Sequence, residues 1–137
     1  MIDYTFLYAF SKQLLNLDKS IRWMAITDKF GVILNADYKE GLKPLMTQEE
    51  NEEYASSTVT RQKTRIKFES KIGKLIYAFG RYEKLNRVTI PINDNYYLLI
   101  TLDVEESNYD EILMEKVISL VEKERRNFVV EYVESKE

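Results

Sequence analysis

The sequence predicts an α+β domain, because segments with helical periodicity alternate with groups of strand-like segments. Apolar residues recur three and four positions apart in Tyr4–Leu17 and again after Asn108. Between them, runs with alternating apolar residues are separated by turn residues. The resulting order is α-β-β-α-β-β-β-α. At 137 residues with 45% hydrophobic content, we expect a single domain spanning 1–137, with a core over about 3–126 and a C-terminal tail over 127–137.

The first three elements form a helix followed by a hairpin. We expect the helix over Tyr4–Leu17, with Asp3 as its N-cap residue. Ile21–Thr27 is the first strand, and Val32–Leu34 the second, with Ala36 as its furthest extent. The turn between them ends in Gly31, which can adopt the positive φ of a type I turn with a bulge.

A long helix is expected over Gln48–Ile72. Thr47 and Glu50 have the spacing of a capping box, and Gly73 is suited to the C′ position. The weakest part is Ser56–Thr60, a run of poor helix formers where a kink or break could occur. The sequence leaves open whether this helix is continuous.

Three strands and a helix follow the long helix. Pro91 cannot donate to a ladder, so its end of a strand should lie at an edge or a bulge. Asn108 should cap the last helix, with Glu111 three residues later. The tail holds an apolar run, Phe128–Val133, whose conformation is left open. The three strands are Leu75–Tyr82, Arg87–Ile92 and Tyr96–Val104. The last is the most apolar, so we place it at the centre of the sheet. Together with Trp23 it should form the centre of the core.

The composition argues against catalysis. There is no cysteine and no histidine, which removes the usual thiolate nucleophile and the commonest general base and metal ligand. Most acids fall in turns or on solvated helix faces; Asp103, inside an apolar strand, is the exception. We therefore expect no enzyme, no catalytic or cofactor-binding residues and no metal site. Without a signal segment or a membrane span, the sequence favours a cytoplasmic protein.

Charge is distributed unevenly along the chain. Residues 1–60 carry six basic and nine acidic residues, a net charge of −3. Residues 61–87 carry nine basic and two acidic residues, a net charge of +7. Residues 88–137 carry five basic and twelve acidic residues, a net charge of −7. Such segregation commonly means that distant segments neutralise each other in the fold. It can also mark a surface for a charged partner.

The basic residues of 61–87 are the candidate partner-binding set. Four of them are spaced to share one face of the long helix, and three follow in the next hairpin, with aromatic residues interleaved. Basic and aromatic residues together can bind nucleic acid. An acidic protein partner is favoured, because the acidic segment 88–137 would repel a long polyanion. The candidate residues are Lys63, Lys67, Lys71, Lys74, Arg81, Lys84 and Arg87.

The order of elements and the hairpin Trp23–Leu34, with its Asp-x-x-Gly turn, resemble the roadblock (dynein light chain type) proteins and their profilin-like relatives. The run Gly73–Lys84, followed by Thr89–Pro91, more specifically resembles a family of uncharacterised archaeal proteins. The roadblock resemblance implies a five-stranded antiparallel sheet in the order 2-1-5-4-3 with helices on both faces. It also implies a homodimeric scaffold that binds small GTPases or other protein partners and performs no chemistry.

In the order that the resemblance implies, the strand Leu75–Tyr82 is an outer edge. A bare apolar edge is an aggregation hazard, so we expect a second copy to cover it, with Ile76, Tyr77 and Phe79 at the dimer interface. PAS domains share a similar sheet, which leaves a small-molecule sensor as an alternative. That alternative requires an internal cavity of at least several hundred Å³.

Overall fold

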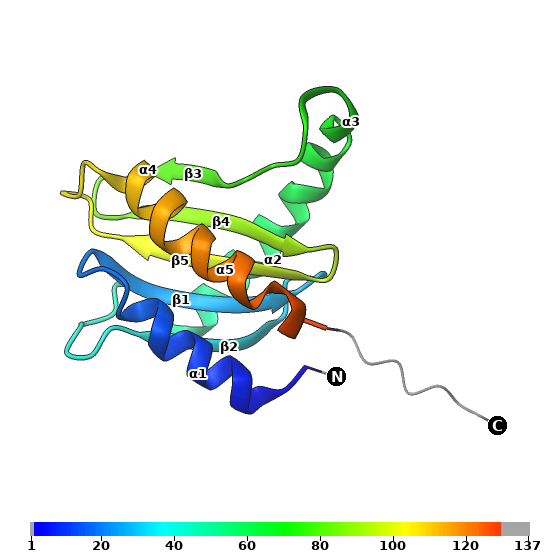
Figure 1. Cartoon of the computed structure of the whole chain (residues 1–137). Coiled ribbons are helices and arrows are strands. Elements are labelled where there is room, and N and C mark those ends of the chain that lie inside the picture. Colours follow the sequence, from blue (N-terminus) through cyan, green and yellow to red (C-terminus); the bar gives the residue numbers. More distant parts are fainter. Residues whose placement is uncertain (1, 130–137) are drawn as a thin grey trace.

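A five-stranded antiparallel sheet organises the computed structural model, which describes residues 2–129 (Figure 1). The strand order is β2-β1-β5-β4-β3. The predicted α+β class and strand order are therefore confirmed. The strands are β1 (Ile21–Asp28), β2 (Ile33–Tyr38), β3 (Ala78–Arg81), β4 (Asn86–Asn93) and β5 (Tyr96–Leu102).

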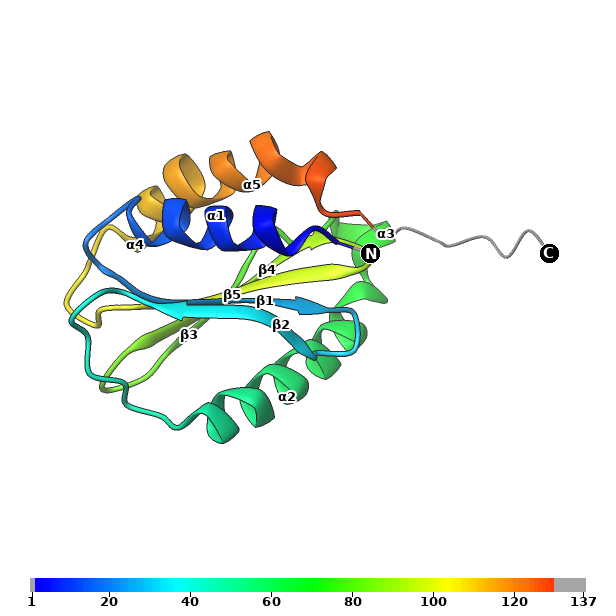
Figure 2. The same cartoon turned by 90° about the horizontal axis from the view of Figure 1, so that it is seen from below.

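Helices cover both faces of this sheet. Figure 2 shows α1 and α5 side by side on one face and α2 alone on the other. The last helical region is irregular, since a π-helical segment, η1, separates α4 from α5. The helical segments are α1 (Tyr4–Leu15), α2 (Gln48–Ile66), α3 (Glu69–Ile72), α4 (Tyr109–Glu111), η1 (Ile112–Val117), α5 (Ile118–Glu124) and the 3₁₀ turn η2 (Arg125–Asn127).

The central strand β5 divides two cores of unequal size. Every residue of β5 is buried, as its apolar sequence predicts. Leu98 and Ile100 face the larger core, which lies beneath α1 and α5. Leu99 faces α2, in a small cluster with Trp23. Trp23 therefore belongs to the smaller core, although the sequence placed it at the centre of a single one.

Local sequence signals set several boundaries as expected. The amide of Glu50 donates to Thr47 Oγ1 (3.1 Å), and the Thr47 amide donates to Glu50 Oε1 (2.8 Å), which completes the capping box. Gly31 has φ +84° in the β1–β2 turn. A register shift follows Pro91, where β4 meets β5, so of the two expected alternatives, an edge or a bulge, the structure has the irregular pairing of a bulge.

The expected long helix is two helices, and the interruption lies at Lys67 and Phe68. The run Ser56–Thr60, predicted to be weak, stays helical because Thr58 and Val59 are buried against the sheet. Gln62 is the last buried residue of α2. Beyond it the helix has no further packing, and packing of this kind is what stabilises most helices in proteins.

Other boundaries also differ from the expectation. β3 begins at Ala78 instead of Leu75; Leu75 donates its amide to Glu69 Oε2 (3.2 Å), which holds the preceding segment against α3. Asn108 makes no side-chain cap. Its amide instead donates to Glu106 Oε2 (3.0 Å).

The segment expected as a tail contributes to the core. Phe128 is buried and packs edge-on against Phe6 and Phe10, with ring centroids 5.0 and 5.2 Å away. Its carbonyl accepts a hydrogen bond from Asn93 Nδ2 (2.8 Å). The remainder of the apolar run, 130–133, lies outside the described residues.

Candidate interaction surface

Large apolar side chains are exposed where α2 gives way to α3 and β3. This region, residues 66–76, is called the α3 corner below, and it projects from the body of the molecule (Figure 1). Ile72 is 84% exposed and Phe68 57%. Ile66 and Ile76 are about half exposed. Four such residues within eleven positions of a folded chain are typical of a surface that another protein covers.

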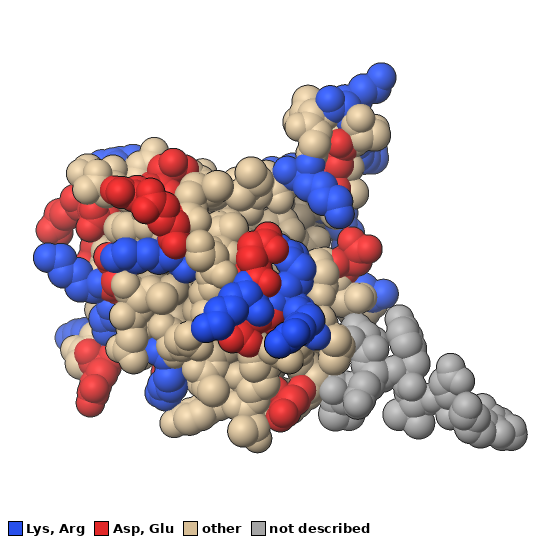
Figure 3. Space-filling model, viewed as in Figure 1, with Lys and Arg blue, Asp and Glu red and all other residues tan. Residues whose placement is uncertain are grey.

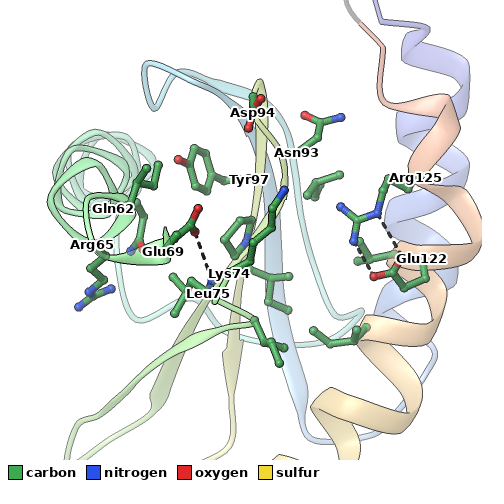
Figure 4. Close-up of a pocket in the computed structure, with 17 residues that line it drawn as sticks. Gln62, Arg65, Glu69, Lys74, Leu75, Asn93, Asp94, Tyr97, Glu122 and Arg125 are labelled. Atoms are coloured by element: carbon green, nitrogen blue, oxygen red, sulfur yellow. Dashed lines mark hydrogen bonds and ion pairs between the residues drawn. The ribbon is translucent and has the colours of Figure 1, made fainter. Parts of the chain in front are cut away.

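A cleft of about 710 Å³ lies beneath the α3 corner. It exists because β3 pairs with β4 only as far as Thr89, so the remainder of β4 has no neighbouring strand on that side. Figure 4 shows the cleft between the end of α2 and α5, with Tyr97 pointing toward Gln62. The volume reaches that required for the sensor alternative, but this is an open cleft between elements instead of an internal cavity.

The seven basic candidate residues do not form one surface. The break after Ile66 removes the common helical stripe, so the expectation of one shared face is wrong. Lys63 lies over the ring of Phe30 in the β1–β2 turn, 5.8 Å from its centroid. Lys67, Lys71 and Lys74 belong to the α3 corner, whereas Arg81 and Lys84 lie at the other end of β3, in the β3–β4 hairpin.

Arg87, predicted to bind a partner at the surface, is buried with 8% of its area exposed. Its guanidinium lies 3.5 Å from the centroid of the Tyr54 ring, and Nη2 contacts the sulfur of Met46. Successive side chains of a strand point to opposite faces of the sheet. Val88 faces the larger core, so its neighbour Arg87 faces α2. Sequence periodicity placed it in a strand but could not show that α2 covers it.

Tyr77 and Phe79 turn away from the sheet edge. The Tyr77 hydroxyl donates to Asp110, and this bond, together with burial, raises the pKa of Tyr77 to about 12. The Phe79 ring stacks on Tyr109, with centroids 4.2 Å apart. Both side chains thus hold the start of the last helical region against β3. Of the three residues expected at a dimer interface, only Ile76 presents a mostly free side chain.

Opposite charges gather at separate places on one face. Figure 3 shows basic side chains on the projecting α3 corner and acidic side chains near α4 and the loop before it. The ion pairs among the described residues join other parts of the chain, and none connects 61–87 with 88–137. Direct ion pairs among residues 2–129 therefore do not neutralise the basic segment 61–87.

A second hollow, about 240 Å³ in volume, lies between α2 and β3. We call it the arginine groove, because Arg61, Arg65 and Arg87 line it and no acidic residue does. Arg61 and Arg65 were not among the candidate residues predicted from the sequence. Their spacing from Tyr54 and Thr58, at four, seven and eleven positions, is a helical stripe that could have revealed them.

Asp103, the acid that the sequence placed inside an apolar strand, has a structural partner. Asp103 stands just beyond the end of β5, and its Oδ1 accepts from Arg22 Nη1 (2.8 Å). No group of acidic side chains among residues 2–129 has an arrangement that could hold a metal ion. Within the same residues, no helix combines the length and the apolar character needed to cross a membrane.

Comparison with known proteins gives no match in sequence and clear matches in structure. No protein-family model matches the chain, and no curated protein matches it. MglB of Myxococcus xanthus superposes with a TM-score of 0.72 at 13% identity, covering 96% of each chain. A structure described as MglB with a tetrameric arrangement gives a TM-score of 0.71 at 13% identity, covering 90% of this chain and 88% of that one.

A Roadblock/LC7 domain from Streptomyces avermitilis gives a TM-score of 0.65 at 10% identity, covering 86% of this chain and 93% of the other. The fold is thus the roadblock fold, in agreement with the resemblance drawn from the first hairpin. MglC of Myxococcus xanthus matches as well, with a TM-score of 0.59 at 14% identity, covering 89% of this chain and 98% of that one.

Proposed function

We propose that this protein is a non-enzymatic interaction module that forms a homodimer and binds another protein. The observation that carries the proposal is the α3 corner, where large apolar side chains stay exposed beside the free edge of the sheet. Burying such a surface is favourable by roughly 25 cal/mol for each Å² of apolar area.

The edge strand supports self-association through the same region. β3 is only four residues long and pairs on one side with β4. Its other side presents unpaired backbone groups that a second copy can satisfy by continuing the sheet. A two-fold contact uses the same surface patch on both copies, so the exposed Ile72 and Ile76 of each copy would be covered by the other copy. The assembly named for one structural neighbour, a tetrameric arrangement of MglB, is consistent with self-association on this fold.

The second partner fits an acidic protein, and the roadblock fold makes a small GTPase one candidate. Exposed lysines surround the apolar side chains of the α3 corner, and the cleft beneath it gives a partner's side chains a recess. An apolar centre with a charged rim is the usual anatomy of a protein interface. Generic nucleic acid is disfavoured, because acidic side chains occupy the same face (Figure 3).

Self-association is tested by light scattering on the purified chain at tens of micromolar. We expect a dimer for the natural sequence and a monomer for Ile72→Asp and Ile76→Asp. Val32→Asp is the matched control, since Val32 is 56% exposed but lies beyond the α3 corner, in the β1–β2 turn. Tyr77→Asp and Phe79→Asp are poor tests, because both would also break contacts within the chain. If the natural protein is a monomer in this measurement, the proposal of a homodimer is wrong.

Partner chemistry is tested with random-sequence oligonucleotides at physiological ionic strength. We expect weak binding. A submicromolar affinity that falls steeply with salt would instead identify a nucleic-acid binder.

A further inference from the structure

The arginine groove exists because of small residues on β3. Ala78 and Gly80 lie opposite Thr89 and Arg87 of β4, respectively, and residues opposite each other on antiparallel strands share a face. That face is the one that α2 covers, since residues of α2 line the same groove. A methyl group and a hydrogen atom leave open the space that larger side chains would fill.

Positive charge in this groove has no counter-charge among residues 2–129. Arg87 is more than nine-tenths buried, and its Nη1 has no hydrogen-bond partner among the described residues. Within the described part of the chain, Arg61 donates only to the neutral Thr58 hydroxyl (2.9 Å). None of the ion pairs among residues 2–129 includes Arg61, Arg65 or Arg87.

A buried guanidinium without an anion is costly. The ring of Tyr54 offsets part of the cost through a cation–π contact. It accepts no hydrogen bond from Nη1, and a buried donor without an acceptor is destabilising. The natural complement is an anion that accepts several hydrogen bonds at once. Guanidinium groups bind phosphate with paired, charge-assisted hydrogen bonds.

We propose that the arginine groove binds a phosphate group, either as free phosphate or as the monoester of a small metabolite. The exposed guanidinium groups of Arg61 and Arg65, together with the buried positive charge of Arg87, match the two negative charges and the several acceptor oxygens of phosphate better than they match one carboxylate. The hydroxyls of Thr58 and Thr89 also line the groove and can donate to the same oxygens. No residue of the α3 corner lines the groove.

Binding is tested by calorimetric titration of the full chain with inorganic phosphate and, separately, with glycerol phosphate, at ionic strength held constant with potassium chloride. We expect saturable binding with a dissociation constant of about 1 mM or tighter. The double variant Arg61→Gln/Arg65→Gln should weaken it at least about tenfold. Lys63→Gln/Lys67→Gln is the matched control, since it removes the same charge from neighbouring positions outside the groove.

A further variant separates the groove from the general charge. A Cβ at Gly80 would meet only Tyr82 Cε2, at 3.5 Å, so Gly80→Val should fold while filling the groove and abolish binding. Tighter binding of glycerol phosphate than of inorganic phosphate would identify a monoester as the ligand. Equal weakening in the two double variants, undiminished binding to Gly80→Val, or no saturable binding to the natural chain would each overturn the proposal.

Discussion

Replacing Gly31 by alanine should destabilise the fold more than its place in a hairpin turn suggests, because Gly31 is itself buried. Gly31 has φ +84°, a conformation that costs other residues roughly 1–2 kcal/mol. An added Cβ would also lie 2.8 Å from Ser56 Cα and 3.0 Å from the Ala55 carbonyl oxygen. These are backbone atoms of α2, so the turn or the helix must shift.

The two effects can be separated by a matched control. Gly41 has nearly the same φ, +81°, but no atom lies within 4 Å of its added Cβ. Gly41→Ala should therefore lose only the free energy of the strained backbone, roughly 1–2 kcal/mol. Gly31→Ala should cost a further 1–3 kcal/mol or so for the forced shift, a magnitude typical of overpacking.

Urea denaturation of the natural chain and both variants measures the free energies of unfolding. A shift confined to the midpoint, with an unchanged slope, would show that stability alone has changed. Equal losses for the two variants, within about 0.5 kcal/mol, would refute the argument that the β1–β2 turn is packed against α2.

Three other perturbations test the remaining layers of the fold. Leu99→Ala should lose about 2–4 kcal/mol of unfolding free energy in the same assay, because its side chain is fully buried; a loss below about 1 kcal/mol would contradict that placement. Thr47→Ala should lose about 1 kcal/mol with its cap, and no change in helix content or stability would contradict the capping role. For Asp18, burial acts to raise the pKa, but hydrogen bonds from Lys116 and Ser20 outweigh it and lower the pKa to about 2. Because the pKa of Asp18 is lower in the folded than in the unfolded state, Asp18 stabilises the protein above about pH 4, and this contribution is lost between about pH 4 and pH 2. Asp18→Asn should therefore flatten the dependence of unfolding free energy on pH in this range. An unaltered pH dependence would count against the ion pair.

The fold could be predicted largely because its signals are local. The capping box at Thr47, the turn glycine Gly31 and the apolar run of β5 each specify a boundary or a place in the sheet without reference to distant residues. The strand order came from the resemblance carried by the first hairpin, and the structure agrees with it.

What the sequence could not show depends on contacts between distant residues. Burial of Thr58 and Val59 keeps α2 helical through a run of poor helix formers, and this burial has no local signature. Arg87 looks like any basic residue of a hairpin until Tyr54 is placed over it. The exposed α3 corner likewise becomes visible only when the end of the sheet is known.

The unequal cores predict that the two sides of the sheet exchange their amide hydrogens at different rates. α2 rests on a small apolar cluster, and its contact layer is completed by polar side chains such as Asn51, Thr58 and Gln62. α1 and α5 instead share the large core. Segments that bury little apolar surface open at low free energy while the remainder stays folded. In a deuterium-exchange time course, α2 should therefore be labelled well before α1. A partner that binds on this side of the sheet should selectively slow amide exchange in α2.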